Sequence, residues 1–247
     1  MRRVTARQRV ATIRAAHGVA PAAPRRLRWT EQVSAPRPVP AGFVRDHTRP
    51  ARPSLVPEVT LQVAADVVAL WEAIEAERGV APTEPPFWAA AWPGGQALAR
   101  YVLDEPSIVA GHSVLDLGSG SGLVAVAAAL AGAARVVASE IDPFGHAAIA
   151  VNAEVNRVRP PVVVGDVLGE EPPEVDVVLA GDVCYDREMS ERVLPWLEAA
   201  RGRGAEVYLG DPGRPYVPVA RLKSVATFDV PDTEGTQVRR TTVWRLP

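Results

Sequence analysis

The chain has 247 residues, a formal net charge of −2 and a single cysteine, Cys184. This length accommodates one well-buried α/β domain with an appendage. A lone cysteine excludes an intrachain disulfide, and no cluster of histidines and carboxylates predicts a metal site. No apolar stretch approaches the roughly 20 residues that span a bilayer, and no signal peptide is visible. We therefore expect a soluble, cytoplasmic protein without membrane contact.

Residues 1–41 are rich in arginine and proline and contain one acidic residue, Glu31, so the rest of the chain is acidic. Such an arm can contact nucleic acid or an acidic partner, but its composition favours a flexible tail with no partner. Residues 42–247 then form one domain. We divide this domain into a helical lead-in over 42–105 and a core over 106–247.

The lead-in predicts two helices separated by a proline-rich loop. The first opens at Pro57 and closes at Gly79, because its apolar residues follow a period of 3.6. These residues are Leu61, Ala64, Val68, Trp71 and Ile74. After the loop and an aromatic segment, Phe87 to Trp92, the second helix runs from Gln96 to about Leu103.

The core predicts alternating strands and helices, the pattern of a Rossmann-like, doubly wound parallel sheet. Strands are expected near 112–117, 135–139, 161–165, 175–181 and 205–210, and helices near 121–132, 143–157 and 187–201. The last two strands, near 224–229 and 237–245, follow one another through Pro231, Asp232 and Gly235. Because no helix separates them, they predict an antiparallel hairpin on the sheet.

A glycine-rich turn joins the first strand of the core to the next helix. Gly118, Gly120 and Gly122 alternate with Ser119 and Ser121, and Asp116 stands two residues before the first glycine. Glycines at every second position let a ligand approach main-chain N–H groups without meeting a side chain. Dinucleotide-binding loops space the third glycine differently. The G-x-G-x-G pattern resembles the S-adenosylmethionine (SAM) loop of class I methyltransferases, and this resemblance implies a seven-stranded sheet.

Acidic residues stand where the later strands end, at Glu140, Asp166, Asp182 and Asp211. Carboxyl ends of parallel strands meet at one edge of the sheet, so we expect one shared cleft. Glu140 is the candidate for the ribose hydroxyls, with Asp142 as the alternative. Asp166 is placed to accept a hydrogen bond from the adenine amine, beside an apolar wall made by Val167.

A carboxylate and a phenol follow the fourth strand, in Gly181-Asp182-Val183-Cys184-Tyr185. This segment resembles the D-x-x-Y signature of the seven-strand lysine methyltransferases of family 16, and Trp92-Pro93-Gly94-Gly95 resembles their tryptophan motif. Together with Phe87-Trp88 and the segment from Gly210 to Arg214, the chain looks most like the electron transfer flavoprotein β-subunit lysine methyltransferases and their bacterial relatives. The resemblance runs from about Phe43 to Leu246.

The resemblance implies SAM-dependent N-methylation of a lysine in a protein substrate, of the electron transfer flavoprotein β-subunit type, by direct in-line transfer. Asp182 and Tyr185 are the catalytic candidates. The cofactor-binding candidates are Trp92, Asp116, Gly118, Ser119, Gly120, Gly122, Glu140, Asp166, Val167 and Gly181.

Three alternatives remain open. One is methylation of a small molecule such as nicotinamide, which the same site could perform with a closed pocket. Nucleic-acid methylation ranks lower, because adenine-N6 enzymes usually carry Asn/Asp-Pro-Pro-Tyr/Phe where this chain has Asp182-Val183-Cys184-Tyr185. A non-catalytic SAM-binding protein is the third alternative, but degraded glycine or acidic positions would then be expected, and they are intact.

Overall fold

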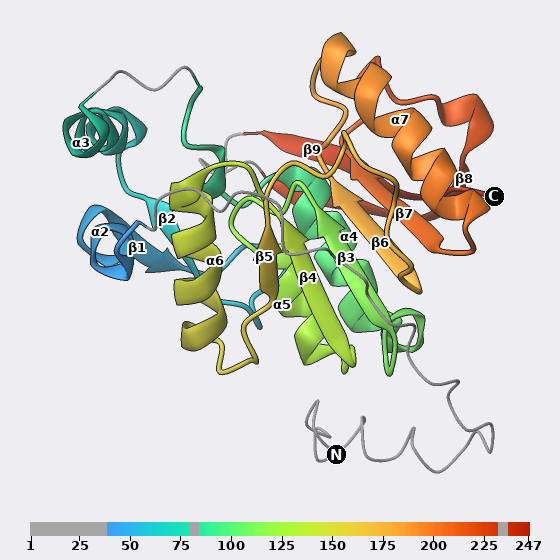
Figure 1. The fold of residues 1–247 in the computed structure, drawn as a ribbon, viewed down its shortest axis with the longest axis horizontal. Helices are drawn as coiled ribbons and strands as arrows, with labels where there is room; N and C mark the ends of the chain where they lie inside the picture. The colour runs from blue at the N-terminus through green and yellow to red at the C-terminus, as the bar shows by residue number, and fades with distance from the viewer. Residues whose placement is uncertain (1–38, 80–83, 232–236) are drawn as a thin grey trace.

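The computed structural model describes residues 39–79, 84–231 and 237–247 (Figure 1). Most of the tail expected over 1–41, and the hairpin turn expected at Asp232 and Gly235, lie outside these residues. None of the described helices is long and apolar enough to cross a membrane.

The core is a seven-stranded sheet in the order β5-β4-β3-β6-β7-β9-β8. The strands are β3 (Ser113–Leu117), β4 (Arg135–Ser139), β5 (Val162–Val164), β6 (Val177–Gly181), β7 (Glu206–Asp211), β8 (Lys223–Pro231) and β9 (Val238–Arg245). The first five pair in parallel, whereas β9 pairs antiparallel with both β7 and β8. The predicted doubly wound sheet and its C-terminal hairpin are therefore confirmed.

Helices cover both faces of the sheet, which explains why its central strands are apolar on both faces. The helices of the core are α5 (Leu123–Leu130), α6 (Pro143–Val155) and α7 (Arg187–Gly202), and the lead-in adds α4 (Pro93–Asp104). On one face Val114 and Leu179 pack with α4 and α5. On the other face Leu115 and Val178 pack with α7, which Figure 1 shows in orange across the sheet from α4 and α5.

The order of the strands reverses at the middle of the sheet. Strand β3 lies between β4 and β6, so the chain runs outward from β3 in one direction and then returns to continue from β6 in the other. Open α/β sheets bind their ligands at the carboxyl ends of the strands beside such a reversal. The turns that follow Leu117 and Gly181 are therefore where the fold favours a site.

The lead-in mixes helices with a small two-stranded sheet. Its elements are α2 (Ala41–His47), β1 (Thr48–Ala51), β2 (Leu61–Ala64), α3 (Val67–Arg78) and η1 (Phe87–Ala89), and short turns η2 (Pro106–Ile108) and η3 (Val219–Arg221) occur later in the chain.

The predicted helix from Pro57 is wrong over its first turns. Leu61–Ala64 forms the strand β2 opposite β1, and the backbone N–H of Gln62 donates to Asn152 of α6 at 2.8 Å. The helix starts later because Asp66 caps it, accepting hydrogen bonds from the N–H groups of Val68 and Ala69. Its predicted end is confirmed, since Gly79 closes it with a φ of 73°.

Candidate functional site

The glycine loop after β3 needs its glycines. Gly118, Gly120 and Gly122 have φ values of 65°, 53° and 78°, a region that other residues rarely adopt. Asp116 holds the loop against α5, because its Oδ2 accepts hydrogen bonds from Ser119 Oγ at 2.6 Å and from the N–H of Ala125 at 3.0 Å. Burial raises the pKa of this carboxyl to about 7.

Glu140 braces the same loop from the end of β4. One carboxylate oxygen accepts the N–H of Gly120 at 2.7 Å, and the other accepts the N–H of Asp142 at 2.8 Å. Burial raises the pKa of Glu140, although both N–H groups act against this rise. A Cβ at Gly145 would lie 2.7 Å from Glu140 Cγ, so α6 needs a glycine where this side chain packs. Glu140 thus fixes the shape of the loop.

A hollow opens between the glycine loop, the start of α4 and the end of β6. Its lining comprises Ala90, Trp92, Gly95, Asp116, Gly118, Ser119, Gly120, Ser121, Leu123, Val124, Gly181 and Asp182. Seven predicted site residues therefore meet here, namely Trp92, Asp116, Gly118, Ser119, Gly120, Gly181 and Asp182. The hollow occupies the strand-order reversal.

Four predicted cofactor residues lie outside the lining: Glu140, which braces the loop from behind, and Gly122, Asp166 and Val167. Gly122 caps α5, and Asp166 is half-exposed and ion-paired with Arg192 at 2.7 Å. To bind an adenine amine, the Asp166 carboxylate would have to leave Arg192 or accept hydrogen bonds from both groups at once. Val167 is 1% exposed, and Trp196 Nε1 donates to its carbonyl at 3.0 Å. Its side chain belongs to the core beneath α7 in this structure.

Asp182 is held by two groups far away in the sequence. Its Oδ2 accepts the N–H of Gly95 at 2.7 Å, and Arg214 Nη1 donates to its Oδ1 at 2.8 Å. Its backbone has a φ of 61°, an unusual value that Asp tolerates better than most residues. Burial raises the pKa of Asp182, and Arg214 opposes that rise. Asp182 nonetheless belongs to the lining of the hollow.

Four glycines bring α4 onto the strand ends. A Cβ at Gly94 would lie 2.2 Å from the carbonyl oxygen of Gly210, and a Cβ at Gly181 would lie 2.8 Å from Gly95 Cα. This contact places the first turn of α4 beside Asp182. The tryptophan motif contains Gly94 and Gly95, but it does not by itself indicate their packing role. Two glycines in the first turn of a helix, where glycine is unfavourable, are the signal of close packing in the sequence.

Three aromatic rings lie next to this hollow. The Phe87 ring is 5.9 Å from that of Trp92 and 6.1 Å from that of Tyr185, between ring centroids. Trp92 Nε1 donates to the Phe87 carbonyl at 2.7 Å, so this pair is fixed. Trp92 and Tyr185 are 41% and 43% exposed, unusually high for large rings. Burial raises the pKa of Tyr185, as do the nearby Glu84 and Asp186.

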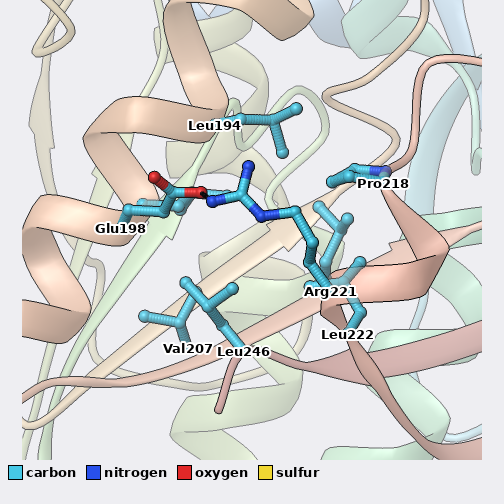
Figure 2. Close-up of a pocket in the computed structure, with 9 residues that line it drawn as sticks. Leu194, Glu198, Val207, Pro218, Arg221, Leu222 and Leu246 are labelled. Atoms are coloured by element: carbon cyan, nitrogen blue, oxygen red, sulfur yellow. Dashed lines mark hydrogen bonds and ion pairs between the residues drawn. The ribbon is translucent and has the colours of Figure 1, made fainter.

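A second pocket lies between α7 and the C-terminal strands and shares no residue with the hollow (Figure 2). Leu194, Val207, Leu222 and Leu246 make it apolar, and the Arg221–Glu198 ion pair crosses it. None of the predicted site residues lies there. Within the described ranges, no three His, Cys, Asp or Glu side chains are grouped to hold a metal ion.

Comparison with known proteins gives consistent matches. The family model of the ribosomal protein L11 methyltransferases (PrmA) matches residues 97–183. Electron transfer flavoprotein beta subunit lysine methyltransferase from Danio rerio is 37% identical over 213 residues, covering 82% of this chain and 81% of that protein. The Xenopus laevis protein of that name is 36% identical, covering 83% and 86%.

The human protein of the same name is 42% identical over 165 residues, which cover 66% of this chain. The match spans 62% of the length of that human relative. Among solved structures, SMU.776 complexed with SAH superposes with a TM-score of 0.51 at 12% identity, covering 76% of this chain and 53% of that one. At this identity the structural match supports the fold alone.

Proposed function

Because the chain belongs to the electron transfer flavoprotein beta subunit lysine methyltransferase family, we propose that it is a SAM-dependent methyltransferase acting on the side-chain nitrogen of a lysine in a protein. The observation that carries this proposal is the shared hollow. It is lined both by the glycine loop that follows β3 and by Asp182, which follows β6.

The shape and the charges of the hollow fit SAM. A Cβ at Gly120 would lie 3.8 Å from Trp88 Cα and would fill space between the loop and η1. Asp116 and Asp182 both contribute to the lining, and the carboxyl group of Asp182, which is paired with Arg214, suits a ligand with a positive sulfonium and a positive amino group. The N–H groups of Ser119, Gly120 and Gly122 are paired within the protein, so in this proposal the glycines allow the ligand to approach the backbone closely. Glu140 is the proposed partner of the ribose hydroxyls and Asp166 that of the adenine amine, as the sequence predicts.

When bound, SAM supplies a methyl group on a positive sulfonium, which a neutral amine takes in one in-line step. A free lysine has a pKa of about 10.4, so its ammonium lacks the lone pair that must attack. An apolar, partly enclosed slot lowers the pKa of a lysine by penalising its charged form. Trp92, Phe87 and Tyr185 provide apolar surface of this kind beside the hollow.

Asp182 orients the amine in this proposal. Its carboxylate is fixed at both oxygens, by Gly95 and by Arg214, so it presents an acceptor of defined direction. Holding the reacting atoms in line can lower the activation barrier by roughly 7–11 kcal/mol, and an immobile acceptor helps to hold them. No covalent intermediate on the enzyme is needed.

The protein substrate is the electron transfer flavoprotein β-subunit in this proposal, because the relatives at 36% and 37% identity are named for that substrate. Incubation of the chain with radiolabelled SAM and this subunit should label the subunit on lysine. Mass spectrometry then locates the modified residue, and a substrate with that lysine replaced by arginine is the control. Label that persists on the arginine variant would contradict lysine methylation there.

A further inference from the structure

We propose that Arg214 is the positioning residue for Asp182, and that Asp211 in turn holds Arg214 in place. This inference rests on the proposed function of the site. Arg214 lies in the loop after β7. It belongs to the segment from Gly210 to Arg214 that the resemblance includes, but the resemblance assigns it no role. Nothing in the reaction requires Arg214 to touch the substrate.

The three side chains form one buried chain of contacts. Arg214 Nη1 donates to Asp182 Oδ1 at 2.8 Å and to Asp211 Oδ2 at 2.9 Å. The side chains of Arg214, Asp182 and Asp211 are only 22%, 11% and 1% exposed. A single guanidinium nitrogen therefore joins two carboxylates that water reaches poorly.

Asp211 is rigid because it closes the turn that carries Arg214. Its Oδ1 accepts the N–H of Gly213 and the N–H of Arg214, both at 2.7 Å. Gly213 has a φ of 89°, which allows the chain to reverse there. The backbone and the side chain of Arg214 are thus both fixed to Asp211, and Asp182 receives a preset cation.

Electrostatics make this cation necessary. Burial raises the pKa of Asp182, and the charged side chains that act on it are Arg214, which lowers the pKa, and Asp211, which raises it further. From α4 the N–H of Gly95 donates a hydrogen bond to Asp182, which also lowers this pKa. Cys184 nearby stays neutral, because burial raises its pKa to about 11. Asp116, across the hollow, is a further carboxylate.

Loss of the guanidinium would leave two neighbouring buried carboxylates without a cation. The pKa of Asp182 would then rise, and a protonated Asp182 presents a weaker acceptor to the amine. The rate in Arg214→Gln should consequently fall about tenfold at neutral pH and recover in part as the pH rises. The acid limb of its pH–rate profile, where the rate falls toward low pH, should therefore lie at higher pH than that of the wild-type chain.

The test is the single-turnover rate as a function of pH, measured with saturating SAM. Arg214→Lys should have a higher rate than Arg214→Gln, because lysine keeps the positive charge although it lacks the planar guanidinium group. Adding Asp211→Asn to Arg214→Gln should move the acid limb back toward lower pH, since it removes the repelling carboxylate. Arg221→Gln is the matched control, because Arg221 is an exposed arginine that pairs with the carboxylate of Glu198, and this variant should have the wild-type rate.

Carboxyl-carbon NMR titration of Asp182, assigned with Asp182→Asn, measures the same pKa without any turnover. A folded Arg214→Gln variant with an unchanged acid limb and an unchanged Asp182 titration would overturn the inference. A shifted titration in a protein that methylates no lysine would instead support the Arg214 contact and remove the proposed function.

Discussion

At the scale of single residues, Asp116 is a carboxyl group removed from water and facing a glycine loop. Burial raises its pKa from 3.8 to about 7, against the hydrogen bonds from Ser119 and Ala125. Between these two pH values the unfolded chain has lost the proton while the folded chain keeps it. Rising pH therefore favours the unfolded state through this group, and its contribution to stability is smallest above pH about 7.

Asp116→Asn should remove this pH dependence while keeping an oxygen that can accept both hydrogen bonds. We expect the variant to gain stability over wild type as pH rises from about 4 to about 7, reaching on the order of 2–4 kcal/mol. Urea unfolding of both proteins at several pH values measures the difference. All other titrating groups are common to both, so a difference that stays constant with pH would contradict the shifted pKa.

The glycine loop and its brace should determine cofactor affinity. Gly120→Val places a branched side chain at a φ of 53° and narrows the gap to η1, so SAM binding should be lost. Glu140→Ala should weaken SAM binding by about 1.5–3 kcal/mol, the range for hydrogen bonds to charged groups. Calorimetry measures both affinities. Gly169→Val, at a glycine with open space around it, is the control, and unchanged affinity in folded Gly120→Val would refute the assignment.

At the scale of elements, the docking of α4 on the sheet builds the second wall of the hollow. Gly94→Ala would force a methyl group to within 2.2 Å of the Gly210 carbonyl, and the backbone cannot yield as a flexible side chain would. We expect a loss of stability on the order of 3 kcal/mol or more. Gly202→Ala, near the end of α7 with no atom within 4 Å, should change stability by less than about 1 kcal/mol.

Denaturant unfolding of the two alanine variants compares them directly. Equal stabilities would show that α4 can move away from β7 without cost. In that case the contact between Gly95 and Asp182 would not depend on close packing of the helix.

The elements of the core were predictable because each strand is a short apolar run that ends at a polar residue. Local pattern sufficed for β3, β4 and β6, and a proline-containing link without a helix sufficed for the hairpin of β8 and β9. The helix predicted from Pro57 failed because the run from Leu61 to Ala64 is too short for its apolar pattern to distinguish a strand from a helix. Pairing with β1 and the hydrogen bond from Gln62 to Asn152 decide in favour of the strand, and Asn152 lies 90 positions away in the sequence.

At the scale of the whole molecule, the sequence predicts those site residues that the topology of the sheet brings together at the ends of its strands. Seven predicted residues meet in the hollow, because the parallel strands bring their carboxyl ends to one edge. The role of Arg214 could not be predicted from the sequence, because its partner Asp182 lies 32 positions earlier. The two residues meet only because β6 and β7 are adjacent in the sheet. The role of Val167 beside the adenine is predicted only from its position after a strand, and that position does not determine the face on which its side chain lies.

The first 38 residues should be dispensable for catalysis. They carry no periodic apolar face, whereas the buried Phe43 and Val44 of α2 follow directly after them and must be kept. A chain beginning at residue 39 should match the full chain in melting temperature and in SAM affinity. Intact SAM binding with a large loss of turnover on the protein substrate would instead assign substrate docking to this basic segment.

The proposed chemistry requires the cofactor side and the acceptor side of the hollow to act together, with Asp182 on the acceptor side. Asp182→Asn keeps the side-chain shape and a residue that tolerates the left-handed backbone. It removes the charge. Tyr185→Phe removes only a hydroxyl from the aromatic rim and should be the milder variant.

Single-turnover methyl transfer to a lysine-bearing protein substrate, at saturating SAM, tests this account most directly. We predict that Asp182→Asn lowers the rate at least about tenfold, equivalent to roughly 1.4 kcal/mol of barrier, while SAM affinity changes much less. A wild-type rate in folded Asp182→Asn would contradict the role of Asp182, and methyl transfer that survives replacement of every substrate lysine would contradict the acceptor.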